Sequence, residues 1–253
     1  MKLLQRIFNP RPKKKPVKIN LTYPTQWENL TFDEFRAVCD ILSIRNLDRE
    51  RGLFLCLCAL AHIKPDDPGK YDPAAIKGKM PFIIDGQAYF LSSKTVAEAC
   101  NDIAFVYDEI GLPPSPLEKV DRLLYDVPFD VFYTADSYIL RYQADNQNGA
   151  WLKEAVKALT GGRKRKLLPW ERIAMVVWWN GVKKTLQERY PYVLKGSGSG
   201  VTDRTQAEIL QDLLATMNDN RPQENDKILK SDTHSVLHAL NNIYRDADKR
   251  LSH

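Results

Sequence analysis

Residues Trp170–Tyr190, which read WERIAMVVWWNGVKKTLQERY, decide the fold class of this chain. Pro169 precedes the stretch and a glycine- and serine-rich run at 196–200 follows it, as expected around a helix. Seven consecutive apolar residues, Ile173–Trp179, make the first half of this helix apolar on every side. Such a helix is buried on several sides, either inside the fold or at an assembly interface. Seven apolar residues are far fewer than the roughly 20 that a membrane span needs.

Start signals for further helices occur along the whole chain. Thr31 followed by Glu34 is a capping-box pattern, in which the two side chains bind free backbone N–H groups of the first turn. Residues 53–60 read LFLCLCAL, which is too apolar for a surface helix and indicates the core of the N-terminal half. The predicted helices cover residues 31–42, 48–62, 92–110, 115–125, 128–145, 151–159, 170–190, 202–218 and the segment from 232 onwards.

One short stretch has the pattern of strands. Asp85-Gly86 lies between two β-prone runs, Phe82–Ile84 and Gln87–Leu91. Asp-Gly favours a type I′ turn, because both central residues of that turn need positive φ. The sequence therefore predicts a mainly α fold, a multi-helix bundle with one small β-hairpin at about 82–91.

Charge and proline divide the chain into three predicted parts. The first 18 residues hold seven Lys or Arg and no acid, whereas residues 19–112 hold nine bases against fourteen acids. The prediction is a flexible basic arm at 1–20, a helical N-terminal subdomain with the hairpin at 21–112, and a C-terminal helical subdomain at 113–253 around helix 170–190. The arm either touches nucleic acid or an acidic partner, or it only increases solubility.

The four cysteines are in apolar, helix-like surroundings, which favours reduced thiols and a cytosolic setting over a disulfide framework. The first residues lack a secretory signal pattern. The cysteines are Cys39, Cys56, Cys58 and Cys100.

Pairs of metal-ligating residues occur twice, but neither makes a convincing site. Cys58 with His62, and His234 with His238, are each four residues apart and share a helix face. No third ligand is evident for either pair, and zinc sites need three or four protein ligands. No nucleophile motif or phosphate-binding loop occurs in the sequence. We therefore expect no metal, no cofactor and no enzymatic activity.

Aromatic and apolar residues of the central helix are the candidate partner-binding surface. Helix-spaced aromatics are most often core residues, but they are also common at protein–protein interfaces. The candidates are Met175, Trp178, Trp179, Val182 and Leu186.

Nucleic-acid binding is the alternative suggested by basic residues outside the helices. A run of four bases follows Gly161-Gly162, and three consecutive lysines, Lys13–Lys15, lie in the arm. Binding through such residues would fall steeply with salt. The candidates are Lys13, Lys14, Lys15, Arg163, Lys164, Arg165 and Lys166.

Three segments together resemble a family of phage and prophage proteins from gut Bacteroidetes, associated with tail-gene clusters. The likeness lies in aromatic and apolar positions and includes no diagnostic motif. The opening Trp27, Leu30 and Thr31 before an acidic helix is also similar to tail-assembly chaperones. The three segments are Pro128–Phe132 with Ala135–Tyr138 and Tyr142, Val177–Lys183 with Arg189–Leu194, and Leu229–Tyr244.

This resemblance implies a non-enzymatic role in tail assembly, as a chaperone or binding partner of the tape-measure protein. The alternative is a nucleic-acid-binding module or a structural head–tail or tail component that uses the basic arm. The resemblance supplies no catalytic residues. It implies a protein partner in the host cytoplasm or a place in the virion, with no membrane association, and it leaves homo-oligomerisation open.

Overall fold

The computed structural model describes residues 21–71, 76–145, 147–162, 165–193, 206–218 and 220–251. The described chain is mainly helical with a small three-stranded antiparallel sheet, which confirms the predicted fold class. It forms two compact units. Unit 1 contains the described residues of 21–25 and 48–104, and unit 2 contains those of 26–47 and 105–251. None of the described helices is long and apolar enough to cross a membrane.

The unit boundaries differ from the predicted subdomains 21–112 and 113–253, because residues 26–47 and 105–112 belong to unit 2. The segment 26–47 contains the short 3-10 helix η2 (Trp27–Asn29) and helix α1 (Phe32–Leu42). The Trp27 ring is 2% exposed and packs edge-on against Phe105, and its Nε1–H donates to the Glu109 carbonyl at 3.0 Å. A contact that joins residues so far apart in sequence leaves no local pattern.

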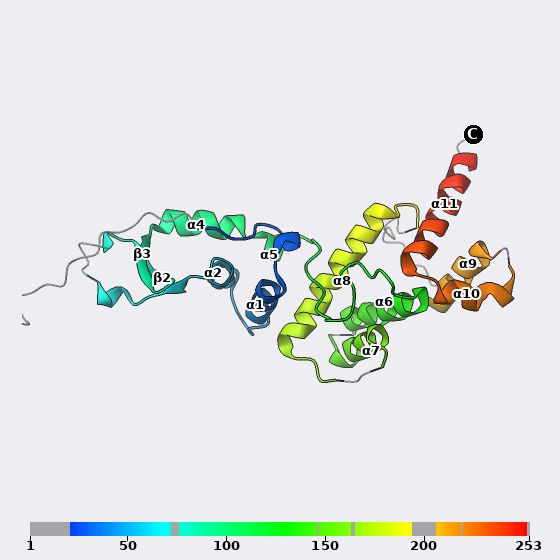
Figure 1. Ribbon diagram of the computed structural model, residues 1–253, viewed down its shortest axis with the longest axis horizontal. Coiled ribbons are helices and arrows are strands. Elements are labelled where there is room, and N and C mark those ends of the chain that lie inside the picture. Colours follow the sequence, from blue (N-terminus) through cyan, green and yellow to red (C-terminus); the bar gives the residue numbers. More distant parts are fainter. Residues whose placement is uncertain are drawn as a thin grey trace, which may run out of the picture. The chain divides into compact units, whose positions relative to one another are not determined.

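Unit 1 packs helix α2 (Arg49–Leu60) against helix α4 (Ser93–Asp102). Asp48 caps α2 by accepting from the Arg51 N–H, and Ser92 caps α4 by accepting from the Thr95 N–H. The interior between α2 and the sheet contains Phe54 and Phe82, with ring centroids 6.2 Å apart. The first described residues run beside α4 (Figure 1), and the Tyr23 hydroxyl donates to Asp102 at 2.8 Å.

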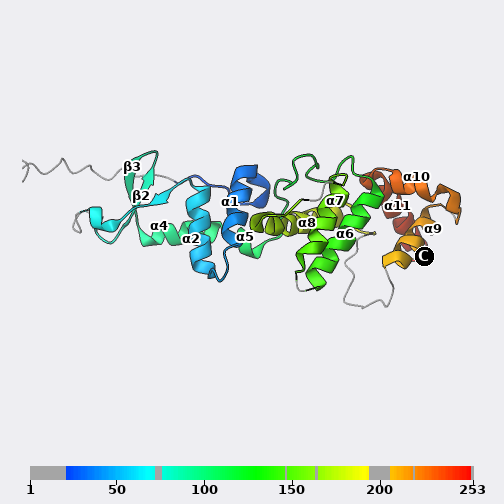
Figure 2. The same cartoon turned by 90° about the horizontal axis from the view of Figure 1, so that it is seen from below.

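The sheet of unit 1 has the order β1–β2–β3, with β1 at Lys64–Pro65, β2 at Met80–Ile84 and β3 at Gln87–Leu91. Figure 2 labels β2 and β3. Asp85 and Gly86 have φ of 48° and 75°, which confirms the predicted hairpin turn. Strand β1 was not predicted. Two residues are too few to show an alternating pattern, so only the pairing with β2 reveals this strand. A 3-10 turn, η3 (Pro68–Lys70), follows β1.

The predicted helix 92–110 is two helices. Helix α4 ends at Asp102, and the four-residue helix α5 (Phe105–Asp108) begins the part of the chain that returns to unit 2. Ile103, at the break, is buried completely. The apolar pattern continues through the break, so the sequence could not show it.

The predicted helix 115–125 is wrong: the connector 109–128 is a series of turns. The Ser115 hydroxyl accepts from the Leu117 N–H at 3.2 Å, and an Asp121 carboxylate oxygen accepts from the Leu123 and Tyr125 N–H groups. These side chains replace helical hydrogen bonds. Leu124 adopts a φ of 65° while its side chain is buried completely, so tertiary packing outweighs the local helix signal.

Unit 2 is helical. Three of its predicted helices are confirmed as α6 (Phe129–Ala144), α7 (Gly149–Leu159) and α8 (Pro169–Arg189). The predicted helix 202–218 appears as α9 (Gln206–Met217), and residues 202–205 lie outside the described residues. Two short elements, η4 (Pro222–Glu224) and α10 (Asn225–Lys230), precede the final helix α11 (Thr233–Leu251).

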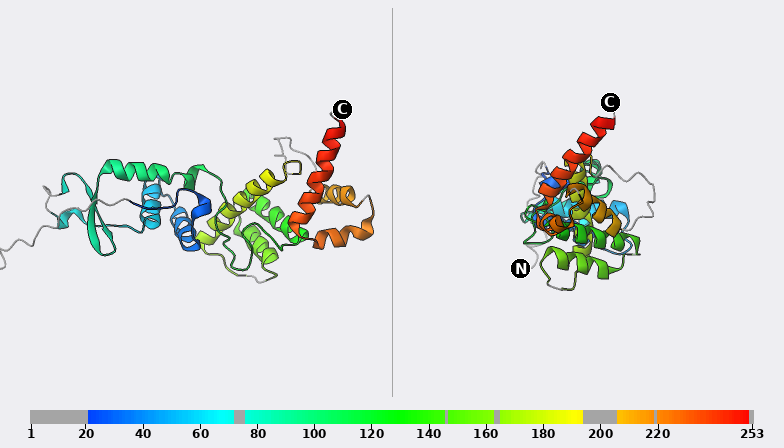
Figure 3. Two further views of the ribbon diagram at one scale, coloured as in Figure 1. Left: turned by 45° about the horizontal axis from the view of Figure 1, so that its top comes forward. Right: turned by 90° about the vertical axis from the view of Figure 1, so that its right-hand side faces the viewer.

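The start of α11 is fastened to the connector. The Thr233 N–H donates to the Val127 carbonyl at 3.0 Å, and the Phe129 N–H donates to the Ser231 carbonyl at 2.9 Å. Asp232 caps α11 by accepting from the Ser235 N–H at 2.8 Å. The distal half of α11 extends away from α6 and α10 (Figure 3), and its last residue, Leu251, is 88% exposed.

Candidate functional site

The central helix α8 is the core of unit 2, which corrects the predicted partner-binding surface. Each candidate residue is at most 2% exposed, because other parts of unit 2 cover it. These residues therefore stabilise the fold and present no surface to a partner in this structure. They are Met175, Trp178, Trp179, Val182 and Leu186.

Both central tryptophans of α8 use their only polar atom. Trp178 Nε1–H donates to the Arg122 carbonyl of the connector at 2.9 Å, and Trp179 Nε1–H donates to Asp136 of α6 at 2.9 Å. The second Asp136 oxygen accepts from Lys183 at 2.7 Å. Each tryptophan thus links α8 to a different element while its ring fills the core.

Gly181 of α8 is where the connector crosses the helix. A Cβ atom at this position would lie 2.8 Å from the Gly111 carbonyl carbon and closer still to its oxygen. Lys184, one turn on, donates to the Ile110 carbonyl at 2.8 Å. Only glycine allows this approach of two backbones.

The N-terminal turn of α8 differs from the middle of the helix because apolar side chains reach solvent there. Phe32 of α1 is 42% exposed and Leu168, the N-cap residue of α8, is 49% exposed. The Trp170 ring packs edge-on to Phe32 with centroids 6.3 Å apart, and the Arg36 guanidinium lies over it at 5.2 Å. We call these four residues, Phe32, Arg36, Leu168 and Trp170, the α1–α8 edge.

Trp170 has a buried N–H group that lacks a hydrogen-bond acceptor within the described residues. Buried polar groups are nearly always paired, so an unpaired one needs an explanation. The carboxylate of the neighbouring Glu171 accepts from the Leu168 N–H at 2.7 Å and from Arg165, and it makes no hydrogen bond with the Trp170 N–H. Unlike Trp178 and Trp179, Trp170 therefore contributes its ring without a bond that fixes it.

His234 joins α11 to α8 and the connector. Its Nε2 lies 2.8 Å from the Leu123 carbonyl and its Nδ1 lies 2.9 Å from the Tyr190 hydroxyl. A carbonyl only accepts, so Nε2 carries the hydrogen and Nδ1 accepts from Tyr190. The ring also stacks on Tyr125 at 4.3 Å. Both ring nitrogens are in use, so His234 holds the fold together.

The predicted pairs of metal-ligating residues are not assembled into sites. His238 contacts Asn242 at 3.1 Å, away from the bonds of His234. Among the described residues, no group of three or more His, Cys, Asp or Glu is placed to hold a metal ion. Burial raises the pKa of Cys56 to about 12 and that of Cys58 to about 11, which keeps both as thiols.

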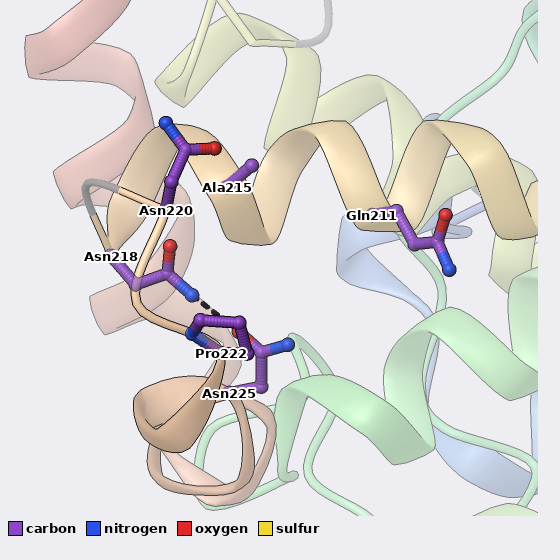
Figure 4. Close-up of a pocket in the computed structure, with 6 residues that line it drawn as sticks. All are labelled: Gln211, Ala215, Asn218, Asn220, Pro222 and Asn225. Atoms are coloured by element: carbon purple, nitrogen blue, oxygen red, sulfur yellow. Dashed lines mark hydrogen bonds between the residues drawn. The ribbon is translucent and has the colours of Figure 1, made fainter.

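A cavity of about 300 Å³ lies between α9 and α10, and side-chain amides line most of it (Figure 4). Asn218 is only 7% exposed, accepts from the Arg221 N–H at 3.1 Å and donates to Asn225. Figure 4 shows Asn218 and Asn225 facing each other, whereas Asn220 points away from the pair. The innermost amides therefore bond to one another and stabilise the turn.

Two further cavities adjoin each other at Lys119, on the connector. One, of about 370 Å³, lies between the connector and the end of α7, and the other, of about 400 Å³, extends to Arg165. Their rims carry Glu118 and Asp126 beside these two bases. The mixed signs favour neither an anionic nor a cationic ligand.

The residues of the nucleic-acid alternative are only partly described. Lys13, Lys14, Lys15, Arg163 and Lys164 lie outside the described residues. Arg165 forms an ion pair with the buried carboxylate of Glu171, so it has a structural partner. Lys166 is exposed.

No protein-family model, no curated protein and no solved structure matches this chain.

Sequence reasoning missed the α1–α8 edge. Phe32 is the first residue of α1 and lies off the Phe35 and Val38 face, and Leu168 occupies an N-cap position where polar residues are usual. The sequence signal that could have indicated this edge was the presence of apolar residues at two helix starts, outside the apolar stripe of each helix. Their meeting depends on the packing of α1 against α8, which is long-range.

Proposed function

We propose that this chain is a non-enzymatic interaction protein of phage tail assembly, which binds the tape-measure protein as a chaperone or assembly partner. Two things support the proposal. The first is the resemblance of the three segments to proteins of tail-gene clusters. The second, and the observation that carries it, is the α1–α8 edge, where Phe32 and Leu168 expose apolar surface beside Arg36 and Trp170.

The chemistry of the α1–α8 edge suits a protein partner. Aromatic residues and arginine are enriched at the centres of protein–protein interfaces, and tryptophan and arginine are frequent where binding energy concentrates. A tape-measure protein exposes long apolar helices before the tail tube forms around it. A partner helix can lay such apolar residues against an apolar edge by the helix-in-groove mode.

The test is co-expression of the chain with the tape-measure protein of its own genome, followed by affinity capture. The informative variant is Phe32→Asp, because position 32 is the first residue of α1 and an acid is favourable there. The matched control is Leu140→Asp on α6, since Leu140 is 44% exposed, about as much as Phe32.

We expect the wild-type chain and Leu140→Asp to keep the tape-measure protein soluble and to co-purify with it, and Phe32→Asp to lose at least ten-fold in captured protein. Equal capture by Phe32→Asp would move the binding surface away from the α1–α8 edge. If the tape-measure protein aggregates even with the wild-type chain, the chaperone role is wrong. Incorporation into virions and salt-dependent DNA binding would then be tested.

A further inference from the structure

The two edges of the unit 1 sheet differ in how they are protected. Strand β1 has only two residues, Lys64 and Pro65. A charged residue, a proline and a short length are the usual means by which proteins block an edge strand from pairing. Strand β3, on the opposite edge, has five residues, Gln87–Leu91, with neither a charge nor a proline.

The register shows which backbone groups of β3 face outward. In a hairpin with a two-residue turn the flanking residues, here Ile84 and Gln87, exchange hydrogen bonds, and bonded pairs then alternate along the ladder. Tyr89 and Leu91 therefore also bond to β2, whereas Ala88 and Phe90 direct their N–H and C=O groups away from it.

A backbone hydrogen bond on the β1 side of β2 agrees with this alternation. Pro81, the β2 residue opposite Phe90, accepts from the Asp66 N–H at 3.0 Å on the β1 side. Within the described part of the chain, no backbone hydrogen bond engages Ala88 or Phe90 on the outer side of β3. These two residues thus offer two donors and two acceptors at an unprotected edge.

We propose that β3 pairs with β3 of a second copy of this chain, antiparallel, about a two-fold axis at Tyr89. In this register Ala88 lies opposite Phe90 of the second copy, and each such pair joins two outward-facing residues. Each of the two Ala88–Phe90 pairs can therefore exchange two hydrogen bonds, which gives four in total. Tyr89 faces Tyr89 of the second copy in the closer, non-hydrogen-bonded type of pair.

The side chains of this register are complementary. The small Ala88 lies beside the large Phe90 of the second copy, and the two half-buried Tyr89 rings form an aromatic cross-strand pair. Strand β3 carries no charge, so no like charges meet across the axis. A self-complementary edge favours a second copy over an unrelated strand.

The first test is the mass of the full chain in solution, measured by light scattering from roughly 1 to roughly 200 µM, because small interfaces are weak. We expect the average mass to rise from 29.1 kDa towards twice that value. Tyr89→Lys should return the chain to a monomer, since two lysines would face each other. Far-ultraviolet circular dichroism verifies that this variant is folded. A chain that is monomeric at every concentration, or a Tyr89→Lys variant that still dimerises, overturns the proposal.

The second test distinguishes this register from any other dimer. Across the axis the Tyr89 Cα atoms are about 4.5 Å apart, within the roughly 4.4–6.8 Å that a disulfide allows. The two copies of Gln87 are roughly 14 Å apart, because four residues separate them along the strands. With oxidised glutathione as oxidant, Tyr89→Cys should form a disulfide-linked dimer at least ten-fold faster than Gln87→Cys.

The wild-type chain, which keeps its own cysteines, gives the background rate of cross-linking. Equal rates for Tyr89→Cys and Gln87→Cys, or no cross-linking above that background, would overturn the proposed pairing of β3 with β3 about Tyr89. The proposal does not depend on the role in tail assembly, because neither measurement uses a tape-measure protein.

Discussion

Two parts of helix α8 carry tryptophans in different settings. In the middle, Trp178 and Trp179 are buried and each donates a hydrogen bond to another element. In the first turn, Trp170 is also buried, but its ring contacts exposed Phe32 and its N–H lacks an acceptor within the described residues. The sequence shows the same residue type at all three positions. The bonds around each ring distinguish a residue that fixes the fold from one at an exposed edge.

The largest expected effect tests the middle of α8. Gly181→Ala should lower the free energy of unfolding by about 3–5 kcal/mol, because its Cβ would collide with the backbone of Gly111. The measurement is chemical denaturation followed by tryptophan fluorescence.

The matched control for Gly181→Ala is Gly149→Ala in the first turn of α7. Its Cβ would meet only the Arg172 guanidinium, at 3.3 Å, which is the movable end of a long side chain. We expect a change of less than about 1 kcal/mol. Similar losses for the two variants would show that the crossing at Gly181 is not a close backbone contact.

Replacing single tryptophans compares the two parts of α8 directly. Trp178→Phe removes the donor to the part-buried Arg122 carbonyl and should cost about 2–4 kcal/mol of stability. Trp170→Phe keeps an aromatic ring and loses no hydrogen bond, so it should cost about 1 kcal/mol or less. The measurement is the free energy of unfolding of both variants. Equal costs would contradict the distinction.

Leu168→Ser should change stability and partner binding in opposite directions. A serine at the N-cap of α8 can accept from the Glu171 N–H and should raise the free energy of unfolding by about 0.5–1 kcal/mol. The same change removes apolar surface from the α1–α8 edge and should weaken capture of the tape-measure protein. Thermal unfolding and affinity capture measure the two effects. Binding that rises together with stability would argue against the α1–α8 edge as the binding surface.

Local patterns predicted much of the fold correctly. The helix after Thr31 follows from its capping-box pattern, the helix around Trp178 from its apolar run, and the hairpin at Asp85-Gly86 from turn chemistry, because these signals need only neighbours in sequence. The predicted helix 115–125 is wrong because the conformation of this segment depends on contacts with residues distant in sequence. Ser115 before Pro116 resembles a helix cap, but Ser115 and Asp121 accept hydrogen bonds within turns while Leu124 enters the core.

The candidate site was less predictable than the fold. The pattern in Ile173–Trp179 correctly indicates burial on several sides, but it could not show that unit 2 itself supplies the cover. The α1–α8 edge depends on a ring contact between Phe32 and Trp170, which are 138 positions apart. Such a contact depends on packing, so one sequence does not reveal it.

The smallest expected effect concerns a fully hydrogen-bonded carboxylate in unit 1, Asp66. Asp66, beside the protected strand β1, accepts from Lys70 and from the Tyr71 hydroxyl, each at 2.6 Å, and from the Asp67 N–H. These donors, Lys70 first, lower the pKa of Asp66 to about 2. A free aspartate has a pKa of about 3.9, so the stabilisation is complete above that pH and is lost as the pH falls towards 2.

Asp66→Asn should therefore flatten the loss of stability between about pH 4 and pH 2, and Tyr71→Phe, which removes one donor, should flatten it less. The measurement is the urea midpoint of each variant across this pH range, relative to its own value at neutral pH. If Asp66→Asn follows the wild-type slope, the network beside β1 contributes nothing to stability.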